Sequence, residues 1–188
     1  MPLPEEQFYT EEDYWNLPED VLAELIDGRL YYMTSPSRIH QEISSVLHGL
    51  IFQYIRPKKG SCRVYHAPFA VKLRKDRDNT VEPDLAVICD RSRLTDRGCT
   101  GAPDWIIEIV SPGNPGQDYV RKLNLYADAG VREYWIIDPS EKSVLVYIHN
   151  QKRFQVTPYT FEDNIKVGIF DDFTIDFTEV MSDIPMDE

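Results

Sequence analysis

The sequence has few of the features that mark membrane, secreted or fibrous proteins. Among its 188 residues no apolar run approaches the ~20 residues that span a bilayer, and one of the longest, Trp105 to Val110, is interrupted by Glu108. The first eight residues contain no Lys or Arg and no apolar core, so we expect no secretory signal. With 9 glycines and no internal repeat, the chain is not collagen-like. We therefore expect a protein without a membrane-spanning segment.

Cysteine is also scarce, and its pattern matches neither of the usual cysteine frameworks. The chain has Cys62, Cys89 and Cys99, an odd number without a C-x-x-C pair. This pattern supports neither a disulfide scaffold nor a zinc ribbon. We expect three reduced thiols, as in a cytoplasmic protein.

Basic charge is in deficit overall but is unevenly spread. There are 20 Lys and Arg against 32 Asp and Glu, a net charge of −12, which argues against a protein that coats nucleic acid nonspecifically. Residues 56–97 nevertheless contain eleven basic and six acidic side chains, whereas residues 171–188 contain seven acidic and no basic ones. Either both segments are ordinary solvated faces, or the first forms a modest basic strip that faces phosphate on a molecule whose remaining surface repels it.

The length and a hydrophobic content of 42% are typical of one folded domain. We expect residues 1–188 to form a single domain with an N-terminal helix and hairpin and an acidic C-terminal tail from about residue 171. Asp27-Gly28, flanked by apolar residues, predicts the tight turn of a hairpin over residues 24–33. Helical periodicity predicts helices over residues 36–55, ended by Pro57, and 118–129, ended by Gly130.

Short apolar or β-branched segments predict the strands. They are residues 62–66, 69–74, 81–89, 105–110, 133–138, 143–149 and 153–160. The order of helix, strands, helix and further strands predicts an α/β or α+β fold, with a mixed sheet and helices packed on it.

Two carboxylates occupy unusual positions in these apolar strands. Glu108 interrupts one strand and Asp84 opens the apolar run 85–88. Such a carboxylate needs a partner, a proton or a metal, since burying it unpaired costs several kcal/mol. Either each acid reaches solvent or a basic side chain, or the two together offer oxygen ligands to a divalent cation. Lys122, four residues after Asp118, taken alone fits an exposed ion pair on the second helix.

Taken in order, these residues resemble a known nuclease motif. The series Pro83-Asp84, Glu108-Ile109-Val110 and Lys122-x-x-x-Tyr126 resembles the PD-(D/E)xK nuclease superfamily, and within it the Uma-two family of restriction-endonuclease-like proteins. The closer likeness lies in residues 24–28, 36–40, 82–84, 101–104, 107–112, 122–131 and 133–139.

The resemblance implies a restriction-endonuclease-like fold, a mixed central sheet flanked by helices, and metal-dependent hydrolysis of phosphodiester bonds in DNA. Asp84 and Glu108 would bind Mg²⁺ or Mn²⁺ together with the backbone carbonyl of Ile109. The lysine of the E-x-K triplet is absent, because Val110 stands there. In the Uma-two family this lysine has moved to the following helix, which places it at Lys122. Its ammonium would orient water or stabilise the developing charge.

Further candidates and partners follow from the same resemblance. Glu24, His40 and Tyr126 are further candidates for facing the site. The alternatives are that Glu24 is a charge at a strand edge, that His40 is a hydrogen-bonded histidine of the core, and that Tyr126 only packs on the sheet. Tyr134 and Trp135 are expected in the core. DNA is the expected substrate, and a homodimer is plausible because nucleases of this fold often pair to cut two strands. The alternatives are a noncatalytic nucleic-acid- or protein-binding module on the nuclease scaffold, or a regulatory, antitoxin-like protein acting through its acidic tail.

Overall fold

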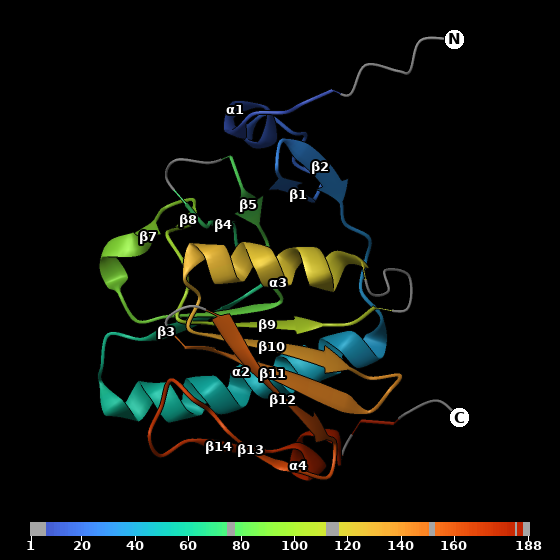
Figure 1. The fold of residues 1–188 in the computed structure, drawn as a ribbon, viewed down its shortest axis with the longest axis vertical. Helices are drawn as coiled ribbons and strands as arrows, with labels where there is room; N and C mark the ends of the chain where they lie inside the picture. The colour runs from blue at the N-terminus through green and yellow to red at the C-terminus, as the bar shows by residue number, and fades with distance from the viewer. Residues whose placement is uncertain (1–6, 75–77, 112–116, 151–152, 183, 186–188) are drawn as a thin grey trace.

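The fold is built from two six-stranded sheets and two long helices, as seen in a computed structural model (Figure 1). The structure describes residues 7–74, 78–111, 117–150, 153–182 and 184–185. The strand order is β2-β1-β5-β4-β8-β7 in the first sheet, here sheet A, and β12-β11-β10-β9-β6-β3 in the second, sheet B. Both sheets contain parallel and antiparallel pairs. The predicted class, a mixed α/β fold flanked by helices, is confirmed, with two sheets where one was expected.

Sheet B forms the centre of the molecule. Its strands are β3 (Arg63–His66), β6 (Leu85–Ile88), β9 (Trp105–Ile109), β10 (Glu133–Asp138), β11 (Ser143–Asn150) and β12 (Arg153–Thr160). Strands β9 and β10 are nearly all buried because both faces of the sheet are covered. Side chains alternate between the faces, so Ile107 and Trp135 join one core cluster and Ile106 and Tyr134 the other. The expected core positions of Tyr134 and Trp135 are thus confirmed.

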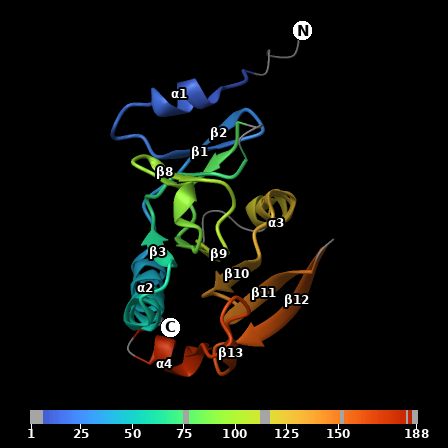
Figure 2. The same ribbon diagram turned by 90° about the vertical axis from the view of Figure 1, so that its left-hand side faces the viewer.

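The two long helices lie on opposite sides of sheet B (Figure 2). Helix α2 (Arg38–Lys58) is capped by Ser37 and packs Ile43, Leu47 and Ile51 on one side. Pro57 was expected to end this helix, but the helix runs one residue past it, to Lys58, and ends at Lys59, whose backbone is in the left-handed conformation typical of a helix end. Helix α3 (Gln117–Ala129) covers the other side, between the two sheets in Figure 1.

Sheet A is smaller and lies beyond α3. It contains β1 (Ala23–Ile26), β2 (Arg29–Tyr32), β4 (Val71–Lys72), β5 (Thr80–Val81), β7 (Leu94–Thr95) and β8 (Gly98–Thr100). The predicted hairpin is confirmed, with Asp27 and Gly28 both at positive φ in its turn. Helix α1 (Glu11–Trp15) and the 3₁₀ turn η1 (Arg91–Arg93) flank this sheet.

The predicted strand over residues 81–89 is wrong as a single element. Residues 80–81 belong to sheet A and residues 85–88 to sheet B. Pro83 lies between the two strands, lacks the amide hydrogen that a continuous strand needs, and lets the chain cross from one sheet to the other. This crossing places Asp84 at the junction of the sheets.

The acidic C-terminal segment contributes to the core rather than hanging free of it. It contains β14 (Thr174–Asp176), paired with β13 (Asn164–Lys166), and helix α4 (Phe177–Met181). Its apolar residues Ile175, Phe177 and Val180 are buried in the α2-side cluster. The acidic residues around them are mostly exposed, so exposed acidic and buried apolar side chains alternate along this segment.

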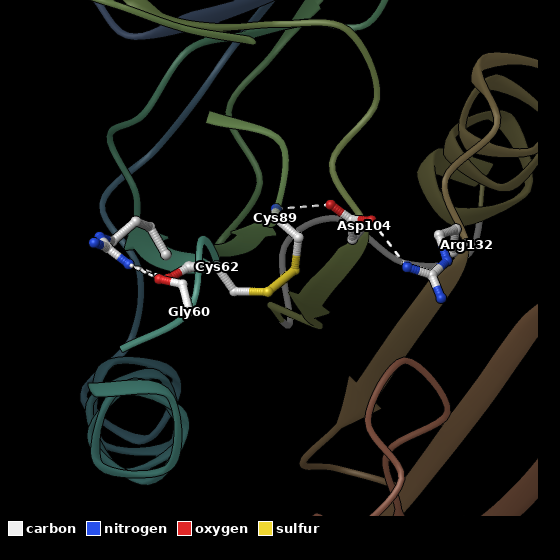
Figure 3. Close-up of a disulfide and its surroundings, with 6 residues drawn as sticks. Gly60, Cys62, Cys89, Asp104 and Arg132 are labelled. Atoms are coloured by element: carbon white, nitrogen blue, oxygen red, sulfur yellow. Dashed lines mark hydrogen bonds and ion pairs between the residues drawn. A yellow bond between two sulfur atoms is a disulfide. The ribbon is translucent and has the colours of Figure 1, made fainter. Parts of the chain in front are cut away.

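The expectation of three reduced thiols is wrong for two of them. Cys62 and Cys89 form a disulfide (Figure 3), while Cys99 is free and buried. Because Arg63 pairs with Ile88 in the β3–β6 ladder, the next pair outward is Cys62 opposite Cys89. Their separation of 27 residues along the chain concealed this pairing, which only the strand register creates. None of the described helices combines the length and apolarity needed to cross a bilayer.

Candidate active site

Five of the candidate residues meet where sheet A, sheet B and α3 come together. Glu24 comes from β1, Glu108 from β9, and Lys122 and Tyr126 from α3. Asp84 immediately precedes β6. Since Leu85 pairs with Ile107 in the antiparallel β6–β9 ladder, continuing the register by one residue sets Asp84 opposite Glu108. The two carboxylates predicted from the sequence are therefore cross-strand neighbours.

Asp84 is held by one of its carboxylate oxygens. Its Oδ2 accepts the backbone N–H of Ile109 at 2.7 Å and lies 3.1 Å from Nε2 of His40. His40 is buried at the start of α2, and its other ring nitrogen, Nδ1, has no hydrogen-bond partner among the described residues. The backbone carbonyl of Asp84 also accepts the N–H of Ala67, which ties the residue to the end of β3. These contacts fix the direction of the carboxylate.

Glu108 is fixed in a similar way from α3. Its Oε1 accepts the hydroxyl of Tyr126 at 2.6 Å and the ammonium of Lys122 at 3.2 Å. Burial raises the pKa of Glu108, the Lys122 ammonium opposes this shift, and the charges of Asp84 and Glu24 add to it. Burial also raises the pKa of Tyr126 well above its usual value, so its hydroxyl remains a donor. Negative charges that raise the pKa of a neighbouring carboxyl in this way are expected where carboxylates lie close together.

Lys122 joins the two sheets through an ion pair with each. Its Nζ lies 3.0 Å from Glu24 Oε2 and 3.2 Å from Glu108 Oε1. Lys122 is only 6% exposed, so the alternative of an exposed ion pair, which fitted Lys122 taken alone, is excluded. Lys122 and Tyr126 are four residues apart and share the buried face of α3. The side chain of Asp118, the partner considered for Lys122, lies outside the described residues.

Glu24 belongs to the same cluster, and a further acid accompanies it. Oε1 of Glu24 accepts the backbone N–H of Glu82 at 2.9 Å. The Glu82 side chain in turn accepts the hydroxyl of Tyr14 from α1 at 2.7 Å. Burial raises the pKa of Glu82, although the bond from Tyr14 opposes the shift. Glu82 was not among the site residues predicted from the sequence, and its position directly before Pro83-Asp84 was the available signal.

The oxygens of Asp84 and Glu108 suit a hard divalent cation. The hydrogen bonds described above fall on Oδ2 of Asp84 and Oε1 of Glu108. The other oxygen of each can therefore face a cation, and oxygen donors are what Mg²⁺ and Mn²⁺ prefer. Among the described residues no group of three or more His, Cys, Asp and Glu side chains is arranged to hold a metal ion. A cation here would need water or backbone oxygens to complete its shell.

Comparison with known proteins shows the family of this chain. The model of the Uma2 family, described as "Putative restriction endonuclease", matches residues 9–178. The chain belongs to the Uma2 family. It is 26% identical over 138 residues to an uncharacterized protein of Synechocystis sp., covering 72% of this chain and 70% of that protein.

A solved structure shows the same fold as this Uma2 protein. It is described as a putative nuclease belonging to DUF820 from Anabaena variabilis. The two share 22% sequence identity with a TM-score of 0.77, over 92% of this chain and 97% of the other. At that identity the likeness establishes the shared architecture.

The structure thus brings together all six candidate side chains of this Uma2 protein. They are Glu24, His40, Asp84, Glu108, Lys122 and Tyr126. The contact observed at Ile109 comes from its amide hydrogen, which binds Asp84, whereas the sequence resemblance had pointed to its carbonyl.

Proposed function

We propose that this Uma2 protein is a divalent-metal-dependent deoxyribonuclease that hydrolyses phosphodiester bonds. One observation carries the proposal: the register of β6 and β9 sets Asp84 opposite Glu108, and Lys122 contacts Glu108 at 3.2 Å. The membership in a family of restriction-endonuclease type supports DNA as the substrate.

Each residue of the cluster has a defined part in the proposed reaction. Asp84 and Glu108 would hold Mg²⁺ or Mn²⁺, with the Ile109 carbonyl as a third donor. Such an ion would neutralise phosphate oxygens and lower the pKa of a bound water. Lys122 keeps an ammonium beside the carboxylates, where charge develops on the phosphate during displacement. Its interaction with Glu24 holds that ammonium at the site.

Tyr126 and His40 act on the carboxylates rather than on the substrate. The Tyr126 hydroxyl binds Oε1 of Glu108 and the His40 ring binds Oδ2 of Asp84, so the second oxygen of each carboxylate is left for the cation. Such outer contacts orient the ligands of catalytic metals and restrict their motion. A homodimer would bring two such sites to the two strands of a duplex.

Cleavage assays on purified protein test the proposal. Plasmid and single-stranded circular DNA are incubated with Mg²⁺, with Mn²⁺ and with EDTA. We expect cleavage only with a metal, and a reduction of at least about a hundredfold in Asp84→Asn, Glu108→Gln and Lys122→Met. Asp171→Asn, an exposed acid outside the cluster, serves as the matched control and is expected to cleave normally.

Two results would reject the nuclease proposal. One is no cleavage by the wild-type protein with either metal, and the other is undiminished cleavage by Asp84→Asn and Glu108→Gln. The net charge of −12 favours a second candidate, a noncatalytic nucleic-acid- or protein-binding module. Absence of metal binding in calorimetry, together with saturable binding of DNA or a protein, would support that candidate instead.

A further inference from the structure

A row of flat side chains follows the outer side of α2 and ends at His66, one residue before Ala67, whose N–H binds the Asp84 carbonyl. It consists of His66, His48, Phe52 and Arg56, and we call it the ring row. The rings of His48 and His66 meet edge to face with centroids 5.1 Å apart. The rings of His48 and Phe52 are nearly parallel at 6.2 Å, and the Arg56 guanidinium lies 5.5 Å from the Phe52 centroid.

The ring row is open to solvent although it is rich in apolar ring surface. Phe52 is 44% exposed, His66 and Arg56 are exposed, and His48 is partly buried. Burial lowers the pKa of His48, and the nearby His66 lowers it further, which favours a neutral ring. None of these four side chains takes part in either core cluster. His48 is hydrogen-bonded to the backbone of Val64, and His66 Nδ1 lies 2.9 Å from the Ala67 carbonyl oxygen, so the two imidazoles are held in place while the Phe52 ring stays open to solvent.

The position of the ring row connects it with the candidate active site. His66 is the last residue of β3 and pairs with Leu85, and the next residue, Ala67, donates its N–H to the carbonyl of Asp84. On α2, successive four-residue steps lead from His40 through Ser44 to His48, Phe52 and Arg56. This row advances about 40° per step and spans about 24 Å, so it starts buried at Asp84 and emerges at the surface. Figure 2 shows α2 and β3 side by side at the edge of the molecule away from α3.

The charge near the outer end of the row fits a polyanion. Arg56 and Lys59 are exposed there, within the segment 56–97 that has an excess of basic side chains in an otherwise acidic protein. The Lys58 ammonium between them is paired with Asp172, so Arg56 and Lys59 supply the positive charge that attracts a polyanion to this end of α2. Flat aromatic groups interleaved with basic ones are the pattern with which proteins bind unpaired nucleotides.

We propose that the ring row stacks the bases of a single-stranded DNA segment and leads that segment to the site containing Asp84. This inference rests on the proposed nuclease function and narrows its substrate class. Unpaired bases expose faces that can stack on His48 and Phe52, whereas the bases of a duplex already cover one another. A second copy of the chain fits less well, because Phe52 is the one large apolar side chain of the row, and stable interfaces bury about 1,200–2,000 Å².

Binding without metal separates this proposal from the catalytic one. Fluorescence anisotropy in EDTA measures the affinity for a labelled oligothymidylate, the matching duplex and an oligouridylate. We expect the single-stranded DNA to bind most tightly, and Phe52→Leu, which keeps apolar volume but removes the ring, to weaken that binding by at least about fivefold. Phe52→Tyr restores the ring and should restore the affinity. Arg56→Gln should reduce the slope of log affinity against log salt by about one contact.

A matched control and a stacking signal complete the test. Phe8 is 65% exposed and packs near Gly28, at the turn of the β1–β2 hairpin, so Phe8→Leu should bind single-stranded DNA as the wild type does. A 2-aminopurine base in the oligonucleotide should change its fluorescence on binding to wild type but not to Phe52→Leu. Three results would overturn the proposal. They are equal affinity of Phe52→Leu and wild type for the single-stranded DNA, tighter binding of the duplex or of the RNA, and a self-association in sedimentation that depends on Phe52. Metal-dependent cleavage that is unchanged in Phe52→Leu, with unchanged binding, rejects the ring row and leaves the nuclease intact.

Discussion

At the scale of the residue, the function of each acid depends on which of its oxygens is already bound. Asp84 uses Oδ2 for His40 and for the Ile109 amide, and Glu108 uses Oε1 for Tyr126 and Lys122. These contacts restrict the rotation of both carboxylates, so the remaining oxygens have a fixed direction. A ligand set that is oriented before the cation arrives loses less entropy on binding.

This orientation makes His40 a positioning residue with a measurable effect. His40→Ala removes the contact with Asp84 Oδ2, and we expect the affinity for Mn²⁺ to fall by about 10–100-fold. His40→Asn keeps a short hydrogen-bond donor and should recover part of the loss. Isothermal titration calorimetry with Mn²⁺ measures both.

The control is His149→Ala, on β11 beside Phe154 and outside the cluster, which should bind Mn²⁺ normally. If His40→Ala bound Mn²⁺ with the wild-type affinity, the orientation of the Asp84 carboxylate would not depend on His40.

At the scale of the element, short strands position the site and glycine makes some of them possible. Strand β8 lies between β4 and β7 in sheet A, and the Cys99 N–H donates to the carbonyl of Ala70 at 2.9 Å. Gly98, just before it, has a φ of +138°, and a Cβ there would collide with the Ala70 carbonyl oxygen. The close approach of β8 to the chain entering β4 therefore requires a residue without a side chain.

Substitution of this glycine should be far more damaging than substitution of a helical one. Gly98→Ala adds both the collision and an unfavourable φ, and we expect the free energy of unfolding to fall by at least about 2 kcal/mol. A methyl group added at Gly49, in α2, would meet no described atom within 4 Å beyond its own stretch of helix, so Gly49→Ala should be neutral or stabilise by up to about 1 kcal/mol. Urea denaturation followed by circular dichroism compares the two. Equal stabilities would contradict the role given to Gly98.

At the scale of the whole molecule, the site exists only because two sheets and a helix meet. Lys122 on α3 is paired with Glu24 of sheet A and Glu108 of sheet B, and all three side chains are buried. At the far end of β6, the Cys62–Cys89 disulfide (Figure 3) closes a loop that contains the four strands β3 to β6 and therefore includes Asp84. Cys89 is further held by Asp104, which accepts its N–H at 2.8 Å.

Reduction of this disulfide should destabilise the fold. Opening a closed loop of this size increases the entropy of the unfolded chain, which lowers the free energy of unfolding by about 2–4 kcal/mol. Urea denaturation with and without a phosphine reductant measures the difference. The double variant Cys62→Ser/Cys89→Ser should have the lower stability and no response to the reductant. Alkylation of three thiols in denatured, unreduced protein would show that the bond is absent.

Most of the elements follow from local sequence. The Asp27-Gly28 turn, the apolar row of α2 and the continuous apolar strand β10 each carry their own signal, because turn chemistry and side-chain periodicity are local properties. Asp84 and Glu108 were recognisable because a carboxylate in an apolar strand is costly and needs a partner. The order of these acids with Lys122 then pointed to the Uma2 family.

The sequence by itself determined which residues could form the site, since residue type and local pattern decide what each side chain can bind. The tertiary structure alone decided how they meet. It split residues 80–88 between two sheets at Pro83, buried Lys122 between Glu24 and Glu108, and set Cys62 opposite Cys89. These outcomes depend on strand register and on the packing of α3 between sheets. Both are set by the burial of the whole core, which no local stretch of sequence encodes.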